Sequence, residues 1–216
     1  VGIIGAGTWG TALAILLNGN GHKVQLWSAI PAEVESLSVN RKHPNLGDTP
    51  IPEEIEITGD LETAMKDNDL LVMSVPSVYV RQTAAKMKPW LKPGQIVTNV
   101  AKGIEEHTML TLSEIIEEEL PEAVAVVDAK QPGATYHFLY LAGCGVSYKL
   151  VQGLKAYRND KTDITEYLEL AAVGTVADIV PLYAENRIIV SEGFQRMKNP
   201  ANMGLGKLLE SAGYDF

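Results

Sequence analysis

Short apolar runs rich in β-branched residues alternate with amphipathic segments over the first half of the chain. Segments with helical periodicity cover about residues 9–20, 31–39, 60–67, 77–90 and 108–119. The runs that we expect to be strands are Val1–Ile4, Lys23–Trp27, Ile55–Ile57, Leu70–Val75, Ile96–Val100 and Val124–Val127. Nearly continuous apolar strands that alternate with helices indicate a parallel sheet covered on both faces. The pattern therefore predicts an α/β fold with a doubly wound parallel sheet in three αβα layers.

The pattern becomes mostly helical after about residue 128. Helices are expected at about residues 141–157, 164–173, 184–198 and 204–212, with a polar connection over 158–165. Two apolar stripes at helical spacing are expected to be core faces that cover the sheet. They consist of Val146, Leu150, Leu154 and Tyr157, and of Ile188, Val190, Phe194 and Met197. We therefore predict a first unit over residues 1–128 and a helical segment over 129–216 that packs on or extends the same sheet.

Charge and composition argue against a nucleic-acid partner and against a membrane-spanning helix. The net charge is −9; residues 1–122 hold 9 basic against 17 acidic residues, and residues 123–216 hold 9 against 10. A nucleic-acid binder usually has a basic excess, so nucleic acid is not an expected partner. No apolar run approaches the roughly 18 residues of a membrane helix. The lone Cys144 fits a reducing compartment, and no signal peptide is recognised, so we expect a cytoplasmic protein.

The most informative motif is Gly5-Ala6-Gly7-Thr8-Trp9-Gly10, which has the form G-x-G-x-x-G. It follows a predicted strand directly and opens a predicted helix, the context that a dinucleotide-binding motif requires. Gly5 would allow the tight turn, Gly7 the approach of a pyrophosphate and Gly10 the packing of helix on strand. The helix N-terminus would attract the phosphates. The motif predicts a Rossmann unit that binds NAD or NADP; the alternative is a structural turn in a domain with another ligand.

The end of the second strand leaves the choice of cofactor open. It reads Leu26-Trp27-Ser28-Ala29, without the Asp or Glu that usually binds the ribose hydroxyls of NAD. No arginine stands there to bind the 2′-phosphate of NADP either. The Ser28 side chain is able to form a hydrogen bond with both cofactors.

Five segments within residues 1 to about 122 resemble the bacterial NAD(P)-dependent sn-glycerol-3-phosphate dehydrogenases. They are IGAGTWGTALA, GHKVQLW, SVPSVYVR, NVAKGIEEHTMLTLSEII and EEELP. The resemblance implies hydride transfer between the nicotinamide and glycerol 3-phosphate or dihydroxyacetone phosphate. It implies that Thr8, Trp9 and the glycines touch the cofactor, that Pro76 and Tyr79 lie near its adenine or nicotinamide side, and that Lys102 faces both cofactor and substrate.

Lys102 is the candidate catalytic residue. It follows the carboxyl end of a predicted strand, where open α/β sheets bind their ligands. A cation there can bind a substrate phosphate or polarise a carbonyl during hydride transfer. The alternative is an ordinary surface lysine. The family's downstream substrate domain, with its main catalytic lysine, has no match in this sequence, so we expect an incomplete active site.

Residues from about 120 to 216 resemble the DHH phosphoesterases, and in particular RecJ-type single-stranded-DNA exonucleases. The segments that resemble them are VVDAKQPG, LAGCGVSYKLVQGL, LAAVGTVADIVPL and ENRIIVSEGFQRM. The resemblance implies that Asp178 is a metal ligand, typically for manganese. The Asp-His-His triplet of that family is absent, and one carboxylate cannot supply the roughly six ligands of such a cation. A manganese site is therefore not expected, and Asp178 is alternatively a helix-associated carboxylate.

The two resemblances meet near Glu118-Glu119-Leu120-Pro121-Glu122-Ala123, in the middle of both parent domains. Three hypotheses follow from this junction. The first is a cofactor-binding protein of the dehydrogenase class, the second a metal-dependent phosphoesterase acting on DNA. The third is a folded chimera without catalytic activity. The oligomeric state is not readable from the sequence.

Overall fold

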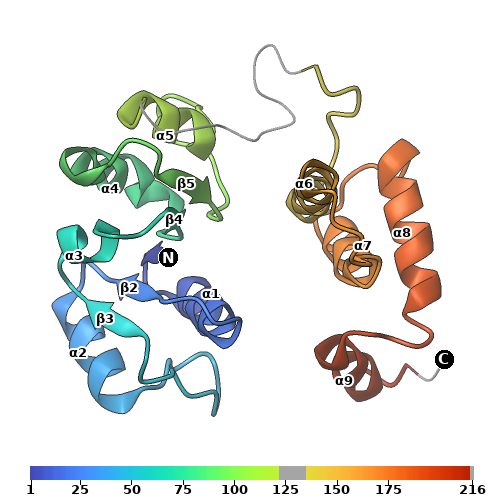
Figure 1. Cartoon of the computed structure of the whole chain (residues 1–216), viewed down its shortest axis with the longest axis horizontal. Coiled ribbons are helices and arrows are strands. Elements are labelled where there is room, and N and C mark those ends of the chain that lie inside the picture. The colour runs from blue at the N-terminus through green and yellow to red at the C-terminus, as the bar shows by residue number, and fades with distance from the viewer. Residues whose placement is uncertain (122–134, 215–216) are drawn as a thin grey trace. The chain divides into compact units, whose positions relative to one another are not determined.

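The computed structural model describes residues 1–121 and 135–214. The predicted strand Val124–Val127 lies outside these residues. The chain divides into two compact units, Val1–Val126 and Val127–Phe216 (Figure 1). The packing of the second unit on the sheet of the first stays a prediction.

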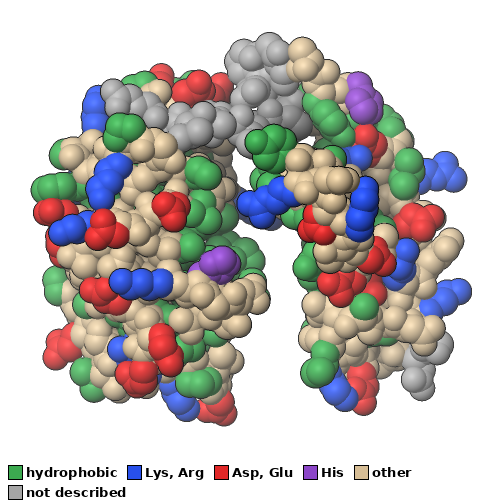
Figure 2. Space-filling model, viewed as in Figure 1, with side chains coloured by type: hydrophobic (Ala, Val, Ile, Leu, Met, Phe, Trp, Pro, Cys, Tyr) green, Lys and Arg blue, Asp and Glu red, His purple; other side chains and the backbone are tan. Residues whose placement is uncertain are grey.

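Acidic and basic side chains are interspersed over the face of each unit that Figure 2 shows. Within the two described stretches, no helix has the length and hydropathy needed to cross a membrane.

The first unit contains a five-stranded sheet with the order β3-β2-β1-β4-β5, in which every neighbouring pair is parallel (Figure 1). The strands are β1 (Gly2–Ile4), β2 (Gln25–Trp27), β3 (Glu56–Thr58), β4 (Leu70–Met73) and β5 (Ile96–Asn99). The chain winds outward from β1 to β3 and then returns to the other side of β1 for β4 and β5. The predicted doubly wound parallel sheet is confirmed, and its direction of winding reverses between β1 and β4.

Helices cover both faces of this sheet because successive side chains of a strand point to opposite faces. Ile3 and Val72 pack in the cluster that includes helix residues Ala14 and Leu37. Ile4, Leu71 and Met73 belong instead to the cluster of the other face. The helices are α1 (Thr8–Gly19), α2 (Pro31–Asn40), α3 (Leu61–Met65), α4 (Val80–Met87) and α5 (Leu112–Glu119), with 3-10 turns η1 (Ser77–Tyr79) and η2 (Lys88–Trp90).

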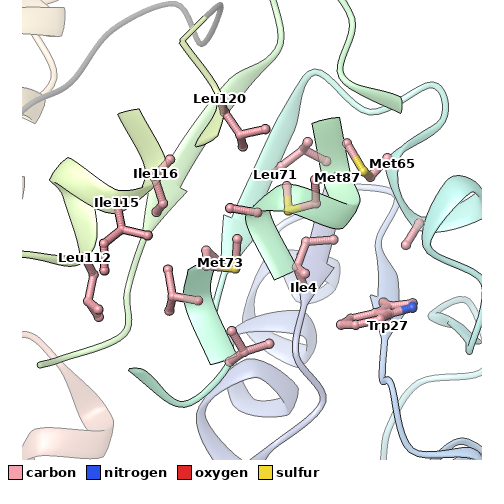
Figure 3. Close-up of a cluster of buried hydrophobic side chains, with 14 residues drawn as sticks. Ile4, Trp27, Met65, Leu71, Met73, Met87, Leu112, Ile115, Ile116 and Leu120 are labelled. Carbon is pink, nitrogen blue, oxygen red and sulfur yellow. The ribbon is translucent and has the colours of Figure 1, made fainter. Parts of the chain in front are cut away.

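Figure 3 shows the second of these clusters, in which Ile4 and Met73 from the sheet meet Met87 and Ile115 from α4 and α5. Trp27 is 5% exposed and lies at the edge of the same cluster. Its indole Nε1 donates a hydrogen bond to the carbonyl of Gly59 over 3.1 Å, so the buried donor is satisfied. The carboxyl end of β2 is thereby held in place next to the segment after β3.

The second unit is helical in its described part, as predicted. Its helices are α6 (Gly143–Arg158), α7 (Tyr167–Ala177), α8 (Ala184–Arg196) and α9 (Met203–Ser211). One small core forms around Tyr148 and Ile189, and another around Ala172 and Met197. Helices α7 and α8 approach closely at Gly193, where a β-carbon would lie 2.4 Å from the Leu168 carbonyl oxygen.

The two apolar stripes contribute little to the cores within this unit, and their predicted role in covering the sheet of the first unit stays a prediction. On α6 the buried residues are Gly145 and Tyr148, whereas Leu150, Leu154 and Tyr157 are exposed. At the C-cap of α8, Met197 is buried, and the buried residues of the helix itself are Asn186, Ile189 and Gly193 rather than Ile188 and Phe194. The reason is that glycines allow close helix contacts, and that Asn186 donates to the carbonyls of Tyr140 and Pro181 over 2.7 and 3.0 Å.

Candidate functional site

A cleft of about 670 Å³ lies at the carboxyl ends of the strands of the first unit. Its walls are residues 5–9 after β1, 27–30 at the end of β2, 74–77 and 79 after β4, and 100–102 after β5, with α4 contributing further side chains. Open α/β sheets bind ligands at this place, where the winding reverses. The residues predicted from sequence that line it are Gly5, Gly7, Thr8, Trp9, Ser28, Pro76, Tyr79 and Lys102.

The three glycines of the motif have different surroundings. Gly5 has a φ of +124°, and a β-carbon on it would lie 2.8 Å from the backbone nitrogen of Val75. Gly10 does not line the cleft; a β-carbon there would lie 1.9 Å from the Gly5 carbonyl oxygen. A β-carbon on Gly7 would have no described atom within 4 Å beyond its chain neighbours. Gly5 and Gly10 therefore close the turn, whereas Gly7 leaves space in the cleft.

Hydrogen bonds fix the glycine turn before any ligand arrives. The Thr11 hydroxyl donates to the carbonyl of Ala6 over 2.9 Å, and the Gly5 nitrogen donates to the carbonyl of Trp27 over 3.0 Å. The Ser74 hydroxyl donates to the Gly5 carbonyl over 2.8 Å and also lines the cleft. We did not identify Ser74 from the sequence; its only signal is a hydroxyl residue directly after an apolar strand.

The N-terminus of α1 is suited to an anionic group. Its N-cap is Gly7, no side chain caps it, and its first turn carries no acidic residue. The first backbone N–H groups and the positive end of the helix dipole therefore remain available for a negative charge. Next to them, the Thr8 hydroxyl accepts a hydrogen bond from the Asn45 amide over 3.0 Å, which ties the long loop at residues 40–54 to this helix end.

Two aromatic side chains and one lysine complete the lining that the sequence predicted. Trp9 is 58% exposed and Tyr79 is 55% exposed, and both belong to the cleft. Lys102 follows β5 and is also exposed there. The adjacent Gly103 has a φ of +139°, and a β-carbon on it would lie 2.8 Å from Ser77 Cβ. This close contact places the loop with Lys102 against the turn with Tyr79.

Arg81 anchors the segment that follows Lys102. Its guanidinium donates to Glu105 from Nε and Nη2 over 2.7 and 2.8 Å, and from Nη1 to Glu118 and Glu119 of α5 over 3.0 and 2.9 Å. The hydrogen bonds from Arg81, and then from the Thr108 hydroxyl, lower the pKa of Glu105 from its ordinary 4.5 to about 2. A bidentate arginine–carboxylate pair thus joins α4 to the loop after β5.

The Arg81–Glu105 pair makes the stability of the first unit depend on pH in the acidic range. Because the folded-state pKa of Glu105 is depressed, its ionised form stabilises the fold above about pH 4.5, and this contribution is lost as the pH falls toward 2. We expect Glu105→Gln to lower the thermal midpoint at pH 6, and the gap between variant and parent to shrink steadily down to pH 3. Glu106→Gln, at an exposed position, is the control and should shift little. A gap that is the same at both pH values would contradict this assignment.

Glu33 is a second residue of the cleft lining that was not identified from the sequence. It lies in the first turn of α2, and its carboxylate accepts a hydrogen bond from the Ser28 hydroxyl. Ser28 is only 3% exposed, and its oxygen accepts from the backbone nitrogen of Ile30 over 3.1 Å. Acidic residues are common in the first turn of a helix because they interact favourably with the helix dipole. The sequence therefore offered no reason to assign Glu33 to the cleft.

Asp178 forms the C-cap of α7, and its backbone nitrogen donates to the carbonyl of Gly174 over 2.9 Å. Among residues 1–121 and 135–214, no three His, Cys, Asp or Glu side chains gather as a metal site would require. Asp128 of the VVDAKQPG segment lies outside the described residues. The metal-ligand role that the resemblance implies for Asp178 is therefore not tested, and the expectation of no manganese site stays a prediction.

Comparison with known proteins assigns the first unit. Residues 1–129 match the sequence family described as NAD-dependent glycerol-3-phosphate dehydrogenase N-terminus. A glycerol-3-phosphate dehydrogenase (NAD(P)+) of Agathobacter rectalis is 49% identical over 128 residues, which are 59% of this chain and 38% of that protein. A second, from Lactobacillus delbrueckii subsp. bulgaricus, is 48% identical over 120 residues, 56% of this chain and 36% of that protein. This chain thus spans less than two fifths of the length of these curated relatives.

Solved structures support the fold of the chain. The crystal structure of glycerol-3-phosphate dehydrogenase from Coxiella burnetii aligns with a TM-score of 0.51 and 23% identity, covering 98% of this chain and 68% of that one. At this identity the likeness concerns the fold alone.

Proposed function

Because the chain belongs to the NAD-dependent glycerol-3-phosphate dehydrogenase family through its N-terminal domain, we propose that the cleft of its first unit binds a nicotinamide dinucleotide. The observation that carries this proposal is the surroundings of Gly7. Its open space lies at the N-terminus of α1, which no side chain caps, within a cleft at the point where the winding of the sheet reverses. A pyrophosphate needs this combination of room and unpaired N–H groups.

The other lining residues have complementary roles in this proposal. Trp9 and Tyr79 offer exposed aromatic rings against which planar bases can pack. Pro76 shapes the wall between β4 and η1. When bound, the nicotinamide supplies the hydride chemistry. Lys102 is placed to bind a substrate phosphate or to stabilise negative charge on a carbonyl oxygen, since its loop borders the same cleft.

We propose that the substrate class is glycerol 3-phosphate and dihydroxyacetone phosphate, with a strongly reduced turnover. The family match ends at residue 129, so residues 130–216 lie outside it. The Lys102 loop lies in the matched part, whereas we expect the family's substrate-binding segments to be missing from residues 130–216. Cofactor binding should therefore be retained more fully than catalysis.

The test is a titration of the purified chain with NADH and, separately, with NADPH, followed by protein fluorescence. Trp9 and Trp27 both line the cleft, and Trp90, the remaining tryptophan, is also in the first unit. We expect saturable quenching, and only slow oxidation of NADH after dihydroxyacetone phosphate is added. A folded protein whose fluorescence does not respond to either NADH or NADPH would overturn the proposed function.

We further propose that residues from about 120 to 216 derive from a DHH-type phosphoesterase domain and that the chain is a chimera without phosphoesterase activity. The support is the sequence GTVADIVPL, followed at residues 185–197 by ENRIIVSEGFQRM. A labelled single-stranded oligonucleotide incubated with the chain and Mn²⁺ provides the second arm of the same test. It should remain intact, and cleavage that disappears in Asp178→Asn would favour a metal-dependent phosphoesterase instead.

A further inference from the structure

The carboxyl end of β2 carries a built hydrogen-bonding unit formed by Ser28 and Glu33. The backbone nitrogen of Ser28 donates to the carbonyl of Thr58 over 3.1 Å, which fixes the residue to the neighbouring strand end. Its hydroxyl donates to the Glu33 carboxylate and accepts from the Ile30 nitrogen. Both Ser28 and Glu33 line the cleft. The pair is therefore held rigidly at one defined place of the cleft wall.

The Ser28–Glu33 pair presents hydrogen-bond acceptors to a ligand but no donor. A hydroxyl has a single donor hydrogen, and that of Ser28 is committed to Glu33. An ionised carboxylate only accepts hydrogen bonds. The pair consequently offers acceptors and a negative charge to a ligand, and no donor. Such a surface suits a group with free hydroxyls and repels a phosphate.

No lysine or arginine of the β2–α2 segment neutralises the negative charge of Glu33. The segment from Gln25 to Asn40, which spans β2 and α2, contains neither lysine nor arginine. Among the described residues of the lining, the basic ones are Lys86 on α4 and Lys102 after β5. Both come from elements on the far side of β1 in the strand order. A phosphate next to Ser28 would thus meet a carboxylate and no cation from its own β2–α2 segment.

In dinucleotide-binding sheets the end of the second strand is the place of the adenosine ribose, whose 2′ position distinguishes NAD from NADP. Resting on the proposed function, we propose that Glu33 makes the cleft selective for NAD(H) over NADP(H). Its carboxylate takes the role of the acidic residue that is missing from the strand end itself, because Ser28 holds it there from the first turn of α2. Two hydroxyls of the ribose would donate to it, and a 2′-phosphate would be repelled.

The test compares NADH and NADPH titrations of the parent, Glu33→Gln and Glu35→Gln. We expect the parent to bind NADH at least about tenfold more tightly, since like charges in contact are strongly disfavoured. Glu33→Gln keeps the size of the side chain but removes the charge, so it should reduce the preference to about threefold or less, mainly by tighter NADPH binding. Glu35→Gln changes an exposed glutamate of the same helix outside the cleft lining and should keep the parent's ratio.

The outcomes separate this inference from the proposed function. Equal affinities of the parent for both nucleotides would overturn the role of Glu33 while leaving the proposed function standing. So would a preference for NADH that Glu33→Gln leaves unchanged. Binding of neither nucleotide would instead remove the proposed function, and this inference with it. The ratio of NADH to NADPH affinity is measured on the parent protein itself. Equal affinities would therefore still overturn the inference if Glu33→Gln folds poorly.

Discussion

A Gly7→Val variant is expected to lose NADH affinity by about 100-fold or more while remaining folded. A β-carbon on Gly7 meets no described atom within 4 Å, and the φ of −63° suits any L-residue. The added β-carbon therefore clashes with no described atom. It enters the space next to the N-terminus of α1, where a pyrophosphate has to approach the backbone closely.

The measurement is the NADH fluorescence titration, made beside a denaturant unfolding curve. Valine is a poorer N-cap than glycine, so a stability loss of about 1 kcal/mol is expected and would not unfold the unit. Gly19→Val is the matched control, because Gly19 lies at the other end of the same helix and also faces open space. Near-normal NADH affinity in Gly7→Val would show that the pyrophosphate does not bind at this turn.

Much of the first unit could be predicted because its signals are local. Strand β1 is followed within four residues by the start of α1, and the glycines between them leave few conformations for the turn. Strands such as β4 are apolar along their whole length because both faces are covered. Such patterns are visible without knowledge of the three-dimensional neighbours, and the parallel sheet followed from them.

The features that sequence reasoning missed depend on contacts between distant segments. Ser74 reaches the Gly5 carbonyl across 69 positions in the chain, and Asn45 reaches Thr8 across 37. Glu33 lies near Ser28 in the chain, but its role becomes visible only when the turn before α2 directs it into the cleft. Residue type alone does not distinguish such a side chain from other surface carboxylates.

The helices of the second unit were predicted correctly, but which of their residues pack within the unit was not, for a related reason. Periodicity placed Leu150 and Leu154 on one apolar face of α6, but the contacts of α6 and α8 within the unit are made at small residues such as Gly145 and Gly193. Hydrophobic patterns count apolar side chains and therefore overlook positions where the absence of a side chain permits contact. The same limit applies to the glycines of the motif. Hydrophobic patterns do not distinguish them, whereas in the structure Gly10 packs tightly and Gly7 faces open space.

Gly10→Ala tests this separation and is expected to destabilise the first unit by about 3 kcal/mol or more. The new β-carbon would lie 1.9 Å from the Gly5 carbonyl oxygen and 2.6 Å from Ser74 Oγ. Neither atom yields easily, because Ser74 donates to that same carbonyl and the Gly5 nitrogen is bound to the Trp27 carbonyl. The clash should exceed the gain of roughly 1 kcal/mol that alanine brings to a helix.

The control is Gly19→Ala, the same exchange in the same helix at a position that faces open space. It should stabilise the unit by up to about 1 kcal/mol, so that the two variants move the unfolding midpoint in opposite directions. Tryptophan fluorescence in a denaturant titration reports on the first unit alone, because Trp9, Trp27 and Trp90 all lie within it. Equal midpoints for the two variants would mean that α1 shifts away from the Gly5 turn at little cost, and that Gly10 is not required for packing the helix against the strand.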